Sequence, residues 1–165
     1  MKHKIIRYIK EILLFLVIMS IFANVISIYK SASLNKEPLK INKLTLLDGT
    51  TYNFVKNKPI MIHFWATWCP TCKLEAGNID RVSKYYNVVT IAVKSGSNKD
   101  IKKFLQEHNL NLKVVNDENS VYAREFNISG FPTTFIYNKN KKLIFSEVGY
   151  TSTLGLYLRM LYGGF

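Results

Sequence analysis

A short apolar run followed closely by two cysteines constrains the fold of this chain more than any other feature. Residues 60–65 (IMIHFW) are typical of a central strand that is covered on both faces of a sheet. Cys69 and Cys72 follow this run, and Pro70 suits the first turn of a helix. Apolar side chains then recur at helical spacing as far as residue 86, at Cys72, Ala76, Ile79, Val82 and Tyr86. The segment therefore predicts a strand, a turn that carries both cysteines, and a helix.

Strand-like and helix-like segments alternate through the rest of the chain. Two hairpins are predicted, 40–47 with 50–55 around Asp48-Gly49, and 132–137 with 143–148 around residues 138–141. Strands at 88–93 and 112–115 and helices at 97–108 and 119–126 lie between them, the first helix beginning with a capping box. A closing helix is predicted with an inward stripe of Leu154, Tyr157, Leu158, Leu161 and Tyr162. This order indicates an α/β fold with a central mixed sheet between helices.

Length and composition fit one domain with an appendage. The 165 residues are 48% hydrophobic and 21% charged, which excludes collagen-like, low-complexity and wholly disordered chains. Two cysteines are too few for a disulfide-stapled miniprotein. The net charge of +12 is spread along the chain without an Arg-rich cluster or a DNA-binding motif, so we expect no nucleic-acid partner.

The appendage is an apolar segment near the N-terminus. Residues 12–28 carry no charge, and as a helix they would be about 26 Å long, close to the hydrocarbon thickness of a bilayer. Basic residues precede the run, so the positive-inside rule places the N-terminus inside and exports the rest. A cleaved signal peptide is the alternative, although Ser31-Ala32-Ser33 is a poor cleavage site. We therefore expect a cytoplasmic tail (1–11), a transmembrane anchor (12–29), a linker (30–40) and a domain (41–165) in the periplasm of a bacterium.

The spacing of the two cysteines suits dithiol–disulfide exchange. A helix N-terminus favours a thiolate over a thiol, which makes Cys69 the attacking sulfur. Cys72 lies one turn further on, where it can resolve a mixed disulfide.

Two cysteines at this spacing have three other uses in proteins. A structural disulfide across so short a loop would constrain the unfolded chain little. A zinc site would need two more ligands, and the only histidines are His3, His63 and His108, so no metal site is expected. Two thiolates can hold Cu(I), and a copper-handling module remains the alternative function.

Several segments resemble a known family. FWATWCPTC at residues 64–72 and GFPTTFIY at 130–137 resemble the membrane-anchored, thioredoxin-like thiol–disulfide oxidoreductases of the TlpA/cytochrome c maturation group. Residues 91–96 and 147–156 resemble most closely its suppressor-of-copper-sensitivity D branch. The resemblance covers about residues 40–162 and implies a thioredoxin fold with an N-terminal hairpin and a helix–strand insert near 99–116.

The resemblance also implies roles for particular residues. Cys69 becomes the nucleophile, Cys72 the resolving cysteine, and Pro132 a cis-proline that faces the dithiol. A redox-active Cys69–Cys72 disulfide is then the only redox group expected, with no further cofactor. Periplasmic protein thiols or disulfides are the expected partners, together with a membrane redox partner. Pro70 and Thr71 between the cysteines do not settle the direction of electron flow.

Several other residues lie near the cysteines or next to Pro132 in the sequence, and two of them allow two interpretations. His63 stands where many thioredoxins have a buried acid, so it either relays the Cys72 proton or is a core histidine. Phe131 either shapes partner choice or only packs, and Trp68 is expected on an exposed apolar docking surface. Trp65 is expected in the core, and Lys73 and Glu75 are expected to be solvated helix residues.

Overall fold

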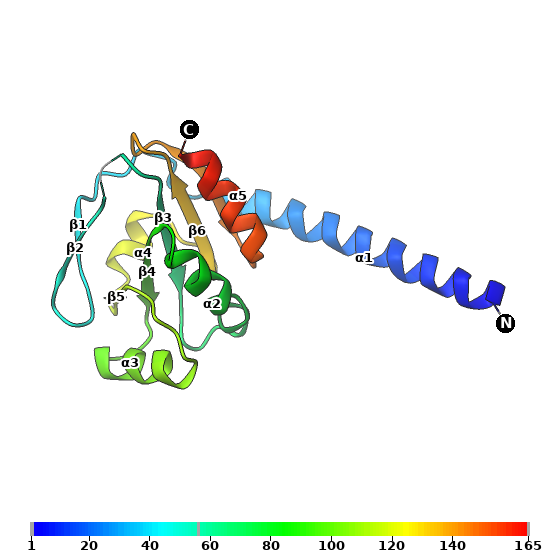
Figure 1. The fold of residues 1–165 in the computed structure, drawn as a ribbon, viewed down its shortest axis with the longest axis horizontal. Helices are drawn as coiled ribbons and strands as arrows, with labels where there is room; N and C mark the ends of the chain where they lie inside the picture. The colour runs from blue at the N-terminus through cyan, green and yellow to red at the C-terminus, as the bar shows by residue number, and fades with distance from the viewer. Residues whose placement is uncertain (1, 56, 165) are drawn as a thin grey trace.

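Residues 2–55 and 57–164 are described by a computed structural model, in which a long helix, α1 (Lys2–Ser31), extends away from an α/β domain (Figure 1). The first residue of the expected tail, the side chains of residues 1–5, and the last residue of the expected domain lie outside this description. One stretch of α1, Ile6–Ser31, is long and apolar enough to cross a membrane. A signal sequence would pass the same test.

A mixed sheet of five strands organises the domain. Its order is β5-β4-β3-β6-β7, with β3, β4 and β5 parallel and with β6 and β7 antiparallel to their neighbours. The strands are β3 (Ile60–Trp65), β4 (Asn87–Val93), β5 (Val114–Asp117), β6 (Thr133–Tyr137) and β7 (Leu143–Val148). Every residue of β3 and β4 is buried, which confirms the prediction of a strand covered on both faces.

Helices and a small hairpin cover the two faces. The elements are β1 (Lys43–Thr45), β2 (Thr51–Asn53), α2 (Pro70–Ser83), α3 (Asn98–Glu107), α4 (Val121–Glu125) and α5 (Thr153–Gly163). In Figure 1, α2 and α5 lie to one side of the sheet, and α4 and the hairpin β1–β2 lie to the other. Buried side chains of α2 and α5 share one cluster, whereas α4 and the hairpin contribute to another. The thioredoxin-like α/β architecture is thereby confirmed, and so is the capping box at the start of α3.

The closing helix is rotated relative to the prediction. Leu156, Met160 and Gly163 of α5 are buried, whereas Leu154, Leu158, Leu161 and Tyr162 are exposed. The predicted inward stripe was therefore wrong at four of its five positions, and only Tyr157 is partly buried against the core. The helix is apolar nearly all round, so both sets of positions have helical spacing and periodicity alone could not choose between them.

The edge strand β5 is shifted by two residues from the predicted 112–115. The polar residues Asn116 and Asp117 belong to this strand. Asp117 also caps the helix that follows. Its carboxylate accepts hydrogen bonds from the N–H groups of Val121 (2.6 Å) and Ala123 (2.8 Å) and so caps α4.

The segment after α1 is packed against the domain. Leu34 and Leu39 are buried in the core, where a free spacer was expected over residues 30–40. The Asn35 N–H donates to the carbonyl of Phe126 (3.2 Å), and its side-chain amide donates to the carbonyl of Glu125 (3.0 Å). The end of α1 is therefore held in one orientation relative to the sheet.

Candidate active site

The two cysteines form a disulfide at the N-terminus of α2. Their Cα atoms are 5.3 Å apart, and the Sγ of Cys69 accepts a hydrogen bond from the Cys72 N–H (3.2 Å). Cys69 is the N-cap residue, and Pro70 occupies the first helical turn, where a missing N–H costs nothing. The positive end of the helix dipole and this N–H both favour negative charge on the Cys69 sulfur.

Both cysteines are largely covered by the rest of the domain. Cys69 is 5% exposed and Cys72 2% exposed, whereas Pro70 and Thr71 between them are exposed.

An aromatic pair stands beside the disulfide. Trp68 is 58% exposed, and its ring meets the ring of Phe131 edge-on at a centroid distance of 5.6 Å. The Trp68 indole N–H donates to the carbonyl of Lys94 (3.0 Å), and the neighbouring Thr67 N–H donates to Ser95 Oγ (3.1 Å). The loop after β4 thus fixes the residues that lead into the disulfide. Trp68 is exposed and Trp65 buried, as predicted.

A groove of about 870 Å³ opens from this aromatic pair. Its apolar lining includes Trp68, Phe131, Val93 and Ile128, and its only ionisable lining residues in the described part of the chain are Lys94 and Arg124. The groove is therefore both apolar and basic.

Pro132 immediately precedes β6. It is buried, and its bond to Phe131 is cis, as the resemblance implied. The Pro132 carbonyl accepts a hydrogen bond from the Gly149 N–H (2.8 Å), which ties this turn to the loop before α5.

His63 lies behind Cys72 inside the sheet. The two residues line one small internal cavity with Trp65, Ala76, Ile79, Leu110 and Leu112. His63 Nδ1 is 2.9 Å from Thr134 Oγ1 on the neighbouring strand. Burial lowers the pKa of His63 to about 3, so the imidazole is neutral at ordinary pH.

Glu75 is a buried acid that the sequence reading placed wrongly. It was expected in solvent, but the side chain is fully buried. One carboxylate oxygen accepts the Thr151 N–H (2.8 Å), and the other has no hydrogen-bond partner among the described residues. Burial raises the pKa of Glu75 to about 8, although the Thr151 hydrogen bond opposes the rise. The signal was available, because position 75 follows Cys72 by three residues and precedes Ile79 by four, on the buried face of the helix.

The site has few groups that could hold a metal. Within residues 2–55 and 57–164, no three side chains of His, Cys, Asp or Glu come together in a cluster that could hold an ion. The Cys69–Cys72 disulfide at the start of α2, next to the central strand β3, is the arrangement of a thioredoxin-like thiol–disulfide oxidoreductase.

Comparison with known proteins leads to the same class. The family model of the AhpC/TSA family matches residues 39–146, so the chain belongs to this family. A thioredoxin-like protein of Haemophilus influenzae is 33% identical over 134 residues, which cover 78% of this chain and 80% of that protein. The thiol-disulfide oxidoreductase ResA of Bacillus subtilis is 30% identical over 94 residues, 54% of this chain and 52% of ResA.

Solved structures share the fold. A secreted disulfide oxidoreductase of Mycobacterium tuberculosis superposes with a TM-score of 0.63 at 24% identity, covering 73% of this chain and 94% of that one. A secreted thiol-disulfide isomerase of Corynebacterium glutamicum gives 0.70 at 17% identity, covering 78% and 85%.

Proposed function

We propose that this oxidoreductase is tethered to the cytoplasmic membrane by α1 and exchanges disulfides with protein partners in the periplasm. The observation that carries the proposal is the placement of Cys69 as the N-cap of α2, with its sulfur on the Cys72 N–H. A structural disulfide would need neither the helix end nor the exposed aromatic residue next to it.

The proposed reaction proceeds in two exchanges. In the reducing direction, the Cys69 thiolate attacks one sulfur of a partner disulfide, forms a mixed disulfide and releases the other partner sulfur as a thiolate. The Cys72 thiolate then attacks Cys69, which releases the second partner thiolate and forms the Cys69–Cys72 bond. Two electrons pass from the enzyme to the partner, and oxidation of a partner dithiol is the reverse.

The thiol proton of Cys72 has to leave before the second exchange. Glu75 is buried three residues after Cys72 on α2, and one of its carboxylate oxygens has no hydrogen-bond partner among the described residues. Glu75 suits this role better than His63, because a group with a pKa of about 8 changes its protonation state near neutral pH. A histidine with a pKa of about 3 stays neutral throughout that range. We therefore assign proton transfer to Glu75. We assign to His63 the positioning of β3 against β6, through its contact with Thr134.

Protein partners would dock on the aromatic groove. Trp68 and Phe131 offer apolar area next to Cys69, and the lining residues Lys94 and Arg124 add positive charge. The backbone around Pro132 would lie alongside the partner segment. We therefore expect an extended apolar or acidic segment of the partner to bind here.

The membrane tether rests on α1. Its described side chains from Ile6 to Phe22 are exposed and mostly apolar, which water disfavours and a bilayer would accept. The N-terminal basic residues support an orientation with the N-terminus inside. A membrane redox partner would then exchange electrons with the dithiol.

The narrower assignment, to the suppressor-of-copper-sensitivity D branch, is also part of this proposal. The two segments that resemble this branch both touch the site. Residues 91–96 bind the loop at Thr67 and Trp68, and residues 147–156 supply the N–H that binds Glu75.

Trapping of mixed disulfides in living cells tests the proposal. In the full-length Cys72→Ser variant the second exchange is blocked, so partner proteins should accumulate on Cys69 in complexes that dithiothreitol releases. The matched variant Cys69→Ser should trap none. Equal trapping by both variants would overturn the assignment of Cys69 as nucleophile, and trapping by neither would overturn the proposed exchange.

A further inference from the structure

We propose that the outward face of α5 lies on the outer surface of the bilayer that α1 spans and contacts lipid there. This inference rests on the proposed membrane tether, but it concerns the catalytic domain itself. The outward face consists of Leu154, Leu158, Leu161 and Tyr162.

The composition of α5 first indicates an unusual surface. Its eleven residues include a single charged one, Arg159, and that side chain is paired with Glu147 at 2.6 Å. The four residues of the outward face are between 54% and 68% exposed. Since Leu156 and Met160 on the opposite side already fill the core, folding of the domain does not use this second apolar face. A helix that is apolar on both sides is typical of one that contacts a second apolar phase.

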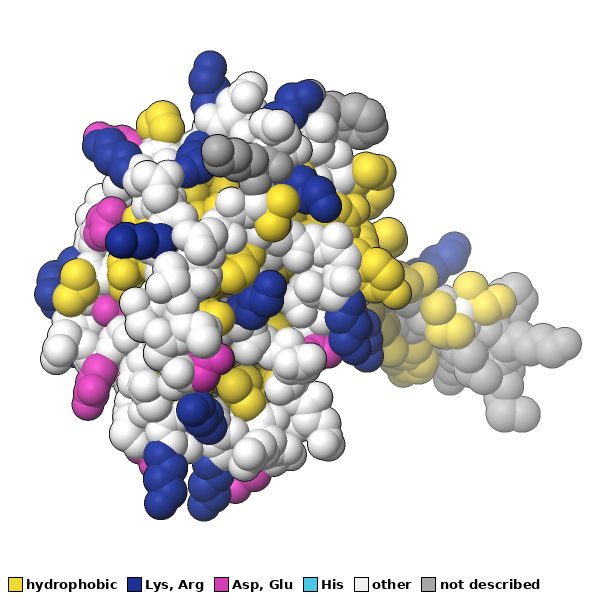
Figure 2. Space-filling view, turned by 60° about the vertical axis from the view of Figure 1, so that its left-hand side comes forward, with side chains coloured by type: hydrophobic (Ala, Val, Ile, Leu, Met, Phe, Trp, Pro, Cys, Tyr) yellow, Lys and Arg dark blue, Asp and Glu magenta, His cyan; other side chains and the backbone are white. Residues whose placement is uncertain are grey.

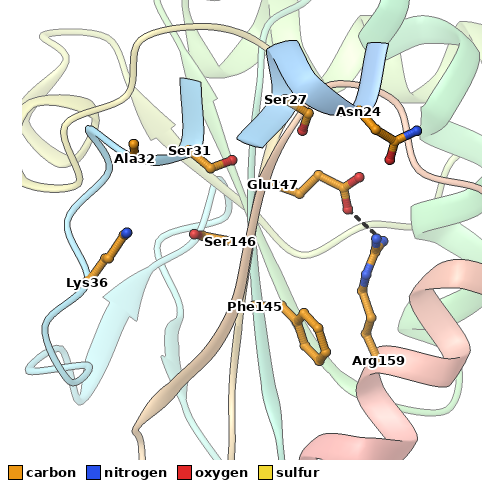
Figure 3. Close-up of a pocket in the computed structure, with 9 residues that line it drawn as sticks. All are labelled: Asn24, Ser27, Ser31, Ala32, Lys36, Phe145, Ser146, Glu147 and Arg159. Carbon is orange, nitrogen blue, oxygen red and sulfur yellow. Dashed lines mark ion pairs between the residues drawn. The ribbon is translucent and has the colours of Figure 1, made fainter. Parts of the chain in front are cut away.

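The position of α5 identifies that phase. A pocket between α1, β7 and α5 is lined by Asn24, Ser27 and Ser31 of α1 and by the Glu147–Arg159 pair (Figure 3). Phe145, which also lines it, lies 5.9 Å from the ring of Tyr162. The outward face of α5 therefore begins beside the last turns of the helix that we assign to the membrane.

The length of α1 limits how far the domain can stand from the bilayer. A transmembrane helix takes about 20 residues, with about 17 as the lower limit, and the uncharged run 12–28 of α1 lies at that limit. Asn24 and Ser27 belong to this run and also line the pocket against α5. The adjacent edge of the domain must therefore lie within the interfacial layer of the bilayer. Hydrophobic side chains gather at this edge, from which α1 extends (Figure 2).

Tyrosines border the outward face. Tyr85, two residues after α2, is exposed, and its ring is 6.1 Å from the ring of Tyr157 on α5. Tyr162 lies in the last turn of α5. Tyr and Trp are enriched at membrane interfaces because one part of the ring is apolar and the hydroxyl or N–H remains hydrated. Because Leu34, Leu39 and Asn35 fix the domain to the end of α1, contact with lipid would hold the disulfide in one orientation above the membrane.

Photo-crosslinking of the full chain tests this inference. Leu158 or Leu161 is replaced by p-benzoylphenylalanine, and the protein is placed in nanodiscs of phosphatidylethanolamine and phosphatidylglycerol. Val121 is the matched control, because it is as exposed as Leu161, at 54%, but belongs to α4 on the other face of the sheet. We expect lipid adducts by mass spectrometry at 158 and 161 and none at 121. A lack of lipid adducts at 158 and 161, crosslinks there to a second copy of the chain, or equal adducts at all three positions would each overturn the inference.

Two controls separate this inference from the proposed function. Disulfide exchange by the same nanodisc samples reports on the dithiol site, so a variant that exchanges normally but gives no lipid adduct contradicts the α5 inference alone. Extraction of the wild-type chain from cell membranes with alkaline carbonate reports on the tether. Release of the protein would contradict the tether, whatever the crosslinking shows.

Discussion

The two sides of the disulfide have opposite characters. Outside Cys69 stand an exposed tryptophan, a partly exposed phenylalanine and two basic residues that line an open groove. Behind Cys72 lies His63, and Glu75 is buried three residues further along α2. Burial moves the pKa of Glu75 to about 8 and that of His63 to about 3. Our proposal therefore assigns partner binding and proton transfer to separate residues. Substitutions in the groove should leave the resolution of mixed disulfides unchanged, and substitutions behind Cys72 should leave the KM for protein partners unchanged.

The largest effect is expected at the boundary between the two sides. Cys69→Ser should abolish exchange with every disulfide, small or protein, because the attacking thiolate is gone. Cys72→Ser should keep the first exchange and lose the second. Stopped-flow measurement of mixed-disulfide formation checks this, and fast formation in Cys69→Ser would contradict it.

The inner side is tested next by Glu75→Gln. A folded-state pKa of about 8, raised from 4.5, means that the folded chain keeps the Glu75 proton up to a higher pH than the unfolded chain does. Its contribution to stability is complete below about pH 4.5 and is lost as the pH rises through about 8, at up to about 1.4 kcal/mol per pH unit. The glutamine variant should lack this loss in urea unfolding at a series of pH values. It should also resolve mixed disulfides more slowly, whereas its KM for protein partners should stay the same.

His63→Asn should show the opposite pH dependence. The folded-state pKa is lowered from 6.5 to about 3, so the contribution of His63 to stability is present above pH 6.5 and is lost as the pH falls toward 3. The variant should lose this acid-dependent part and, at neutral pH, about 1 to 3 kcal/mol because the Thr134 hydroxyl is left without its partner. Thr134→Val is the matched control, since it removes the hydrogen bond but keeps the titrating ring. If Thr134→Val removed the acid dependence as well, the assignment to His63 would fail.

The smallest effect is expected on the outer side. Trp68→Ala should weaken the binding of protein partners by about 1 kcal/mol or somewhat more, which corresponds to a several-fold to tenfold rise in KM. The rate with dithiothreitol should change little, because a small thiol does not need the groove. Tyr85→Ala, which removes an exposed aromatic ring beyond the C-terminal end of α2, should leave KM unchanged. A loss of activity with dithiothreitol in Trp68→Ala would break the separation of the two sides.

The sequence was sufficient for most of the fold, for physical reasons that can be named. Every residue of the run 60–65 except His63 is apolar, so neither face of this strand suits solvent. The capping box at Ser97 marks the start of a helix. Prediction failed at α5, where two apolar faces competed for the core. It also failed for the segment after α1, because the burial of Leu34 and Leu39 depends on partners far away in the chain.

The candidate site was predictable where local chemistry sufficed. The cysteine pair and the exposed Trp68 follow from the motif and the helix that it begins. Glu75 was misplaced because a carboxylate on a helix is usually solvated, although its spacing from Cys72 and Ile79 puts it on the buried face of α2. The Thr151 N–H that binds it comes from a distant part of the chain. The groove could not be predicted, since residues from four distant segments line it.

The redox equilibrium of the dithiol is the most direct test of the central claim. The full-length chain in detergent is equilibrated with glutathione buffers, and the Cys69–Cys72 bond is followed by thiol alkylation and mass. We predict a single reversible two-electron transition within the range of about −270 to −120 mV that related dithiols span. A disulfide that does not form reversibly would contradict the account, and stoichiometric Cu(I) binding by such a chain would replace exchange with copper handling.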